Sequence, residues 1–282
     1  MCMHKKIRMI AFDLDGTTLQ RGNVLSERNR QAMEKAAAAG VYVVPSTGRI
    51  VSFLPPCLTE LPGIRYAITS NGAAVWDMQE NRRICVNLID PETACRVVEI
   101  AREFRLYTEL YVNGRSVTRT GDPEHAAERY DMPPEKRFFT RKDYILKDDL
   151  AVYVREEDVH PEKINFMYVP DAVRDAFHAR LEALGTLEIT YSSVDNFELN
   201  AKGCDKGTGL LAFCAVLGMD PAETMAIGDN GNDLGMLREA GLSVAVGNAI
   251  GTVKSVCDAV VADYREDGFA EAVERFVLCE DI

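Results

Sequence analysis

Short runs of consecutive apolar residues, each long enough for one strand, constrain the fold of this chain most strongly. They lie at 9–12, 41–44, 66–69, 225–227, 243–246 and 259–261. A strand that is apolar at every position is buried on both faces, as in a parallel sheet. Helical patterns lie between them: one that Ser26 can cap stops at Gly40, and another covers 207–217. The alternation predicts an α/β fold with a doubly wound, Rossmann-like parallel sheet.

Residues 84–189 differ from the rest of the chain. They hold strand-like pieces at 84–88, 116–119, 163–168 and 187–191, a helical pattern at 171–184, and a loop rich in proline and charge at 131–137. We interpret 84–189 as a smaller α/β domain inserted into the first one. The core would then consist of residues 1–83 and 190–282.

Composition restricts the class of partner. The 282 residues include 32 Lys and Arg against 44 Asp and Glu, for a net charge of -12. Nucleic-acid binding needs a basic footprint, so we expect no nucleic-acid partner. No apolar run approaches the ~18 residues of a membrane span, and Asp13 and Asp15 interrupt what would be the apolar part of a signal peptide. We expect a soluble, cytoplasmic protein with no membrane partner; the sequence carries no signal for its oligomeric state.

Cysteine and histidine do not form a recognisable metal site in the sequence. The eight cysteines lack zinc-site spacing, and the four histidines lie far apart. We therefore expect the cysteines to be reduced and buried.

Carboxylates follow two of the apolar runs directly. Asp13-Leu14-Asp15-Gly16-Thr17 comes after the first run, and Gly228-Asp229-Asn230-Gly231-Asn232-Asp233 follows 225–227. Ligands of open α/β sheets bind at the carboxyl ends of strands, although polar turns and helix caps also use these residue types. Mg²⁺ prefers oxygen ligands, so Asp13, Asp229 and a backbone carbonyl together suit this cation.

Two other residues suit an anion at the same edge. Thr47, in Ser46-Thr47-Gly48-Arg49 after the second run, has a hydroxyl that can donate to a phosphate oxygen. Lys206 begins a helical pattern, where its charge adds to that of the helix terminus. Either residue alone is a common surface feature.

In this order, the four segments resemble the motifs of the haloacid dehalogenase superfamily of phosphatases, in its Cof-type branch. Residues 69–73 (Thr-Ser-Asn-Gly-Ala) and 247–249 (Gly-Asn-Ala) are also similar to segments of that branch. The resemblance covers 8–82 and 190 onward. The insertion lies between the second and third motifs, where this family carries an α/β cap. Thr18 replaces a commonly apolar residue, and we expect no catalytic consequence.

The resemblance implies a role for each motif residue. Asp13 would be the nucleophile and Asp15 the general acid and base. The metal residues would be Asp13, Asp15 through its backbone carbonyl, Asp229, and Asp233 through a bound water. Contacts to the phosphoryl group would come from Thr47, Asn71, Lys206 and Asn232.

The function expected is a Mg²⁺-dependent phosphomonoesterase that hydrolyses a small phosphorylated metabolite, a sugar phosphate or a phosphorylated cofactor, through an aspartyl-phosphate. A sugar phosphomutase, or a non-catalytic regulatory protein on the same scaffold, is the alternative. The signatures GxGxxG and GxxxxGK[ST] are missing, which argues against a dehydrogenase or a P-loop NTPase. Within 84–189, which we expect to select the substrate, a basic stretch would steer anions or be a solvated face: Lys136, Arg137, Arg141, Lys142 and Lys147.

Overall fold

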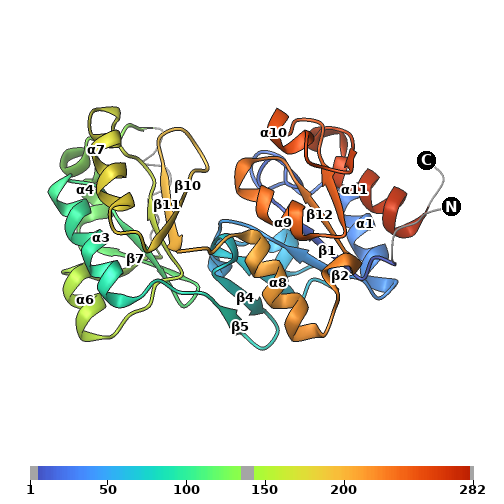
Figure 1. Cartoon of the computed structure of the whole chain (residues 1–282), viewed down its shortest axis with the longest axis horizontal. Helices are drawn as coiled ribbons and strands as arrows, with labels where there is room; N and C mark the ends of the chain where they lie inside the picture. Colours follow the sequence, from blue (N-terminus) through green and yellow to red (C-terminus); the bar gives the residue numbers. More distant parts are fainter. Residues whose placement is uncertain (1–5, 135–142, 280–282) are drawn as a thin grey trace. The chain divides into compact units, whose positions relative to one another are not determined.

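Two compact units make up the chain (Figure 1). The computed structural model describes residues 6–134 and 143–279. Unit 1 contains the chain up to Val86 and from Asp205 onward, and unit 2 is Asn87–Cys204. Both junctions lie later than the boundaries expected from the sequence. Strand β5 (Arg82–Val86) pairs with β4 of unit 1, and β11 (Phe197–Ala201) pairs with β10 of unit 2, so each stays with its partner strand.

Unit 1 is built on a five-stranded sheet in the order β14-β13-β12-β1-β2, with every pairing parallel. The strands are β1 (Met9–Phe12), β2 (Tyr42–Pro45), β12 (Thr224–Gly228), β13 (Leu242–Ala245) and β14 (Ala259–Val260). These are five of the apolar runs in the sequence. The parallel, doubly wound core that they predict is confirmed.

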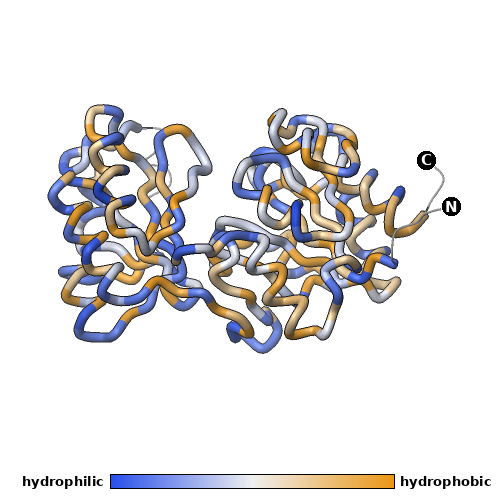
Figure 2. The backbone as a smooth tube through the Cα atoms, viewed as in Figure 1, coloured by the Kyte–Doolittle hydropathy of each residue, from blue (hydrophilic) through white to orange (hydrophobic). Residues whose placement is uncertain are grey.

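Both faces of this sheet are covered, as the continuous apolar runs require. Ile10 and Phe12 of β1 lie in one apolar cluster with α1 (Glu27–Ala38) and α11 (Gly268–Val273). Met9 and Ala11 point the other way, into a cluster with α8 (Lys206–Leu217) and α9 (Leu234–Glu239). Figure 2 shows hydrophilic segments in outer loops and along outer helices, with hydrophobic segments between them. All four β1 side chains are fully buried.

The sixth apolar run, 66–69, forms β3 (Tyr66–Thr69), which is placed differently. It belongs to an antiparallel sheet with β4 (Ala74–Asp77) and β5, while one parallel bridge from Ser46 to Ile68 links it to the end of β2. Shorter elements complete unit 1: α2 (Pro56–Thr59), α10 (Gly251–Lys254), the π-helical turn η6 (Glu274–Leu278), and 3-10 turns η1 (Val51–Phe53), η2 (Ser70–Gly72), η3 (Pro221–Glu223), η4 (Gly231–Asp233) and η5 (Tyr264–Glu266).

Unit 2 has a six-stranded, mainly antiparallel sheet in the order β10-β11-β9-β6-β7-β8. Its other strands are β6 (Glu109–Val112), β7 (Arg115–Arg119), β8 (Ile145–Lys147), β9 (Lys163–Phe166) and β10 (Leu187–Thr190). Helices α3 (Pro91–Glu103), α6 (Leu150–Glu156) and α7 (Asp171–Glu182) pack with apolar strand residues in one core, and α4 (Asp122–Tyr130) follows β7. The helix expected at 171–184 is α7.

Four members of the basic stretch, Lys136, Arg137, Arg141 and Lys142, lie outside the described residues. The fifth, Lys147, has its ammonium 2.6 Å from the Glu157 carboxylate and 4.1 Å from the centre of the Tyr153 ring. Lys147 is therefore part of an ion pair rather than an uncompensated charge.

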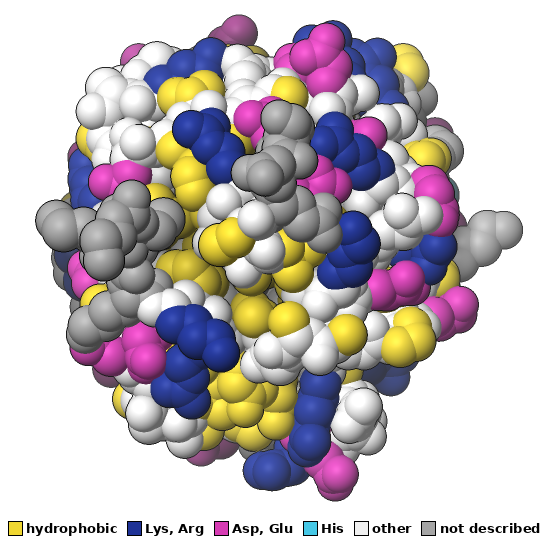
Figure 3. All heavy atoms as spheres, turned by 90° about the vertical axis from the view of Figure 1, so that its right-hand side faces the viewer, with side chains coloured by type: hydrophobic (Ala, Val, Ile, Leu, Met, Phe, Trp, Pro, Cys, Tyr) yellow, Lys and Arg dark blue, Asp and Glu magenta, His cyan; other side chains and the backbone are white. Residues whose placement is uncertain are grey.

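The surface carries both signs of charge. On the face shown in Figure 3, Lys and Arg side chains are interspersed with Asp and Glu, and hydrophobic side chains gather in patches. Within 6–134 and 143–279, none of the helices combines the length and apolar character that a membrane crossing requires. The described cysteines are thiols, of which Cys95, Cys204 and Cys214 are buried.

Candidate active site

Three loops of unit 1 meet at the carboxyl edge of the parallel sheet. Phe12, the last residue of β1, is in register with Ile227 of β12 on one side and Pro45 of β2 on the other. The amide of Asp13 donates to the carbonyl of Ile227 (3.0 Å) and so continues the ladder by one residue. The acidic loops after β1 and β12 are therefore neighbours, as the sequence predicts.

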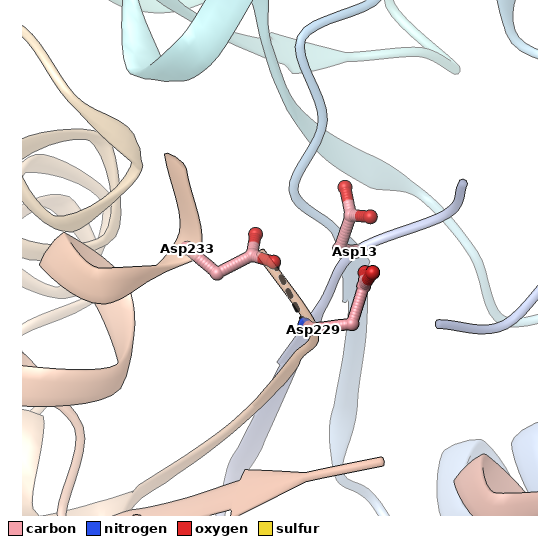
Figure 4. A group of neighbouring side chains, drawn as sticks. All are labelled: Asp13, Asp229 and Asp233. Carbon is pink, nitrogen blue, oxygen red and sulfur yellow. Dashed lines mark hydrogen bonds between the residues drawn. The ribbon is translucent and has the colours of Figure 1, made fainter. Parts of the chain in front are cut away.

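Three carboxylates converge there. Asp13, Asp229 and Asp233 each offer an oxygen, and these oxygens lie within 4.8 Å of one another (Figure 4). Asp233 Oδ2 accepts from the backbone amides of Asp229 (2.9 Å) and Asn230 (3.0 Å). Asp229 Oδ1 accepts from the hydroxyl of Thr17 (2.6 Å). Hydrogen bonds within the second loop and between the two loops thus orient two of the three carboxylates.

One cation, Lys206, reaches this cluster from the start of α8. Its Nζ lies 2.6 Å from Asp13 Oδ1 and 2.6 Å from Asp233 Oδ1, and its side chain is fully buried. The helix start is held by a capping box between Asp205 and Thr208. Because three carboxylates face one ammonium group, the cluster has an excess of negative charge in a largely buried position.

The titration of these groups reflects that excess. Burial raises the pKa of Asp13 to about 8, although Lys206 opposes the rise. Burial also raises the pKa of Asp229 to about 6, against the hydrogen bond from Thr17. Burial alone would lower the pKa of Lys206, but Asp13 and Asp233 outweigh it and raise that pKa, so the ammonium stays charged. The surplus carboxylate oxygens suit a second, hard cation, and the cluster fits Mg²⁺.

Glycines permit these loops to approach one another. Gly16 has φ +86°, and a Cβ built there would lie 2.9 Å from Asp229 Oδ2. At the start of the second loop, a Cβ on Gly228 would lie 2.6 Å from the Cβ of Asp233. Any larger residue at either position would displace a carboxylate of the cluster.

Asp15 occupies a different environment. Its side chain is 63% exposed and accepts from Arg49, with Nε 2.9 Å from Oδ2 and Nη2 2.5 Å from Oδ1. Arg49 Nη2 also lies 2.8 Å from Asn23 Oδ1. A bidentate ion pair therefore holds the carboxylate of the residue predicted to be the general acid and base.

The residues predicted to contact phosphate lie on loops of the same edge. Thr47 and Asn71 are buried, and the amide of Asn71 donates to the carbonyl of Thr47 (3.1 Å). Asn71 has a positive φ, 57°, within η2. Asn232 is half-buried in η4, between Asp229 and Asp233. The structure thus places every predicted site residue in unit 1.

Packing between glycines positions the helix that carries Lys206. A Cβ on Gly209 would lie 2.7 Å from the Cα of Gly72, and a Cβ on Gly207 would lie 2.6 Å from the backbone of Gly235. The start of α8 is therefore wedged between η2 and α9 with no room for side chains at these two positions.

Sequence reasoning gave no role to three residues that support the site. Thr17 orients Asp229, as described above. The buried hydroxyl of Thr18 donates to the carbonyl of Asp13 (2.8 Å), a bond that the sequence did not predict. Asn248 Nδ2 donates to the carbonyl of Gly16 (2.7 Å), and its Oδ1 accepts from the amide of Tyr264 (3.1 Å). Thr17 lies in the motif at 13–17, and Asn248 lies in the segment at 247–249. Their place in these motifs was the sequence signal that could have identified them.

Comparisons with known proteins agree with this geometry. The family model for haloacid dehalogenase-like hydrolase matches residues 10–273. The chain is 30% identical over 272 residues to the 5-amino-6-(5-phospho-D-ribitylamino)uracil phosphatase YcsE of Bacillus subtilis, which covers 96% of both chains. It is 28% identical to the pyridoxal phosphate phosphatase YbhA of Escherichia coli, covering 96% of this chain and 99% of that one.

A solved structure gives the same result for the fold. A haloacid dehalogenase-like hydrolase from B. subtilis superposes with a TM-score of 0.79 at 26% identity, covering 95% of this chain and 99% of that chain. The similarity therefore extends over both units and is not confined to the sheet of unit 1.

Proposed function

The chain belongs to the haloacid dehalogenase-like hydrolase family and is a phosphatase, and from this we propose a Mg²⁺-dependent phosphomonoesterase that works through an aspartyl-phosphate on Asp13. The observation that carries the proposal is the group of three convergent carboxylates with one buried lysine. When bound, Mg²⁺ would neutralise charge so that an anionic nucleophile can approach an anionic phosphate. Asp13, Asp229 and the backbone carbonyl of Asp15 would hold it, with Asp233 acting through a bound water.

In the first step, a carboxylate oxygen of Asp13 attacks phosphorus and the bond from phosphorus to the ester oxygen breaks. Lys206, with Thr47, Asn71 and Asn232, would bind or orient the phosphoryl oxygens. Asp15 would give its proton to the departing oxygen. For this it must exchange its ion pair with Arg49 for the leaving group.

In the second step, Asp15 takes a proton from water, and the water oxygen attacks the phosphorus of the aspartyl-phosphate. Orthophosphate leaves and the carboxylate of Asp13 is regenerated. The cycle consumes one water and releases one alcohol and one phosphate, so it needs no other reactant.

The substrate class is a small phosphorylated metabolite. The names of both relatives describe phosphate esters of small heterocyclic compounds, which supports a compound of that size for this chain. A sugar phosphate or a phosphorylated cofactor fits this class. The cytoplasmic location stays a prediction from the sequence.

The test is a screen of phosphorylated metabolites with Mg²⁺ that measures orthophosphate release. We expect release with Mg²⁺, none in excess chelator, and none from Asp229→Asn. The matched control is Asp158→Asn, because Asp158 is exposed in unit 2 and its positive φ of 49° suits asparagine. Transfer of phosphate to another hydroxyl without orthophosphate release would favour a phosphomutase, and metal-independent hydrolysis would refute the proposed role of the cluster.

A further inference from the structure

Unit 2 contains a cavity that the phosphatase chemistry does not use. It measures about 300 Å³ and lies among α3, α4, α6 and β7. All the residues that line it belong to unit 2, whereas the carboxylate cluster belongs to unit 1. A cavity of this size is at the lower end of the range for small-molecule sites.

Arginines dominate the polar part of its wall. Among the residues that the structure describes, four guanidinium groups line the cavity against one carboxylate, that of Asp122: Arg102, Arg105, Arg119 and Arg129. Arg102 pairs with Asp149 outside the lining (2.7 Å). Even with that pair included, the cavity keeps two more positive than negative groups, in a protein whose net charge is -12. A local cationic excess raises the concentration of anions near it.

The buried carboxylate of Asp122 arranges two of the arginines. Its Oδ1 accepts from Arg119 Nη2 (3.0 Å) and from Arg129 Nη1 (2.7 Å), and its Oδ2 accepts from the hydroxyl of Tyr130. Asp122 is only 3% exposed. One carboxylate neutralises one of two guanidinium groups, so the pair is fixed side by side with one charge uncompensated. This arrangement is preorganised for a second anion.

Within 6–134 and 143–279, Arg105 makes no ion pair with a carboxylate, unlike the other three arginines. Its Nη2 donates to the backbone carbonyl of Arg129 at 3.4 Å, a long contact that leaves most of its donors directed elsewhere. Val98, Leu106 and Leu150 give the wall an apolar side, and Thr108 and Tyr130 complete the lining. The cavity therefore combines a planar, multi-donor cationic side with a hydrocarbon side.

We propose that this cavity binds a small organic anion, with a phosphate or carboxylate group at the arginines and an apolar part against Val98, Leu106 and Leu150. Arginine forks match both oxyanions in a bidentate manner. The proposal goes beyond the phosphatase activity, because binding here requires no residue of the carboxylate cluster.

The probe is phenylphosphonate, a non-hydrolysable anion with one apolar ring, measured by titration calorimetry in excess chelator to disfavour binding at the metal-dependent site. We expect one binding event in the wild-type chain, weakened about tenfold or more in Arg105→Gln. The matched control is Arg155→Gln, which removes an exposed arginine of α6 that pairs with Glu99 (3.2 Å) and does not line the cavity. Its affinity should equal that of the wild type.

Arg129→Gln is the second variant and should also weaken binding. If Arg129→Gln fails to fold because Asp122 loses a partner, the affinity of Arg105→Gln for phenylphosphonate still tests the proposal. No binding in the wild type, or equal affinity in wild type and Arg105→Gln, would overturn the proposal.

Kinetics distinguish the source of the anion. If Arg105→Gln raises KM for phosphorylated metabolites, the cavity belongs to the substrate site, and a separate anion site is refuted. If the anion is a separate effector, Arg105→Gln leaves KM and kcat unchanged and removes only the effect of added phenylphosphonate.

Discussion

Replacing Lys206 by Met should destabilise unit 1 by about 3–5 kcal/mol when no divalent cation is present, because removing one partner leaves buried charge uncompensated. The substitution keeps the length of the side chain but removes two ion pairs of 2.6 Å, to Asp13 and Asp233. Saturating Mg²⁺ should reduce the loss, since the cation can compensate the same carboxylates. Stabilisation by Mg²⁺ should therefore be larger in Lys206→Met than in the wild type.

The assay is urea unfolding followed by tryptophan fluorescence, in chelator and in Mg²⁺. The single tryptophan, Trp76, is buried in β4 of unit 1 and reports on that unit. The control is Arg8→Met, which removes a half-exposed ion pair with Glu223 (3.0 Å) and should cost less than about 1 kcal/mol. The reasoning would be refuted if Lys206→Met and Arg8→Met lowered the free energy of unfolding equally in chelator. It would also be refuted if Mg²⁺ did not reduce the loss in Lys206→Met.

Four other outcomes are expected. In rapid mixing with an aryl phosphate, Asp15→Asn should release a burst of phenol and then turn over slowly, with phosphate mass retained on Asp13, because the second step needs a base; normal steady turnover would contradict this. Ca²⁺ in place of Mg²⁺ should inhibit, since its looser shell misplaces the nucleophile, and full turnover with Ca²⁺ alone would argue against the metal geometry. In chelator, unfolding midpoints should fall as the pH rises from about 4 through about 8, because the folded-state pKa values of Asp13 (about 8) and Asp229 (about 6) exceed the ordinary 3.8 and the folded state holds protons that the unfolded state releases; a flat profile would disprove the raised values. Gly209→Ala should lower kcat, measured by phosphate release, because its Cβ would lie 2.7 Å from Gly72 and push Lys206 aside; unchanged kcat would show that the helix can yield.

The central sheet could be predicted because its signal is local. Strands β1, β2 and β12 are each apolar at nearly every position. A parallel sheet that is covered on both faces requires that pattern. The position of Asp13 and Asp229 at one edge follows from strand ends alone. The roles of Asn71 and Asn232 came only from family resemblance and remain predictions.

Features that depend on distant partners could not be predicted. The boundary between unit 2 and unit 1 after Cys204 depends on the pairing of β11 with β9 and β10. The sequence of β11 alone does not indicate which strands it pairs with. The same holds for the ion pair between Asp15 and Arg49, which depends on side-chain direction. The bond from Thr18 to the carbonyl of Asp13 depends on the turn that the intervening residues make.

The chain order of unit 1 has a consequence for its synthesis. Strand β1 pairs with β12 in the register Met9 to Thr224, so β1 is made more than two hundred residues before its central partner. Unit 2 is one continuous segment and can fold while that partner is still being made. Its folding shortens the loop that must close before β1 and β12 meet. Until then the edge of β1 that β12 covers has no partner. An unpaired apolar strand edge favours aggregation, so we expect the yield of folded protein to depend on how fast unit 2 folds.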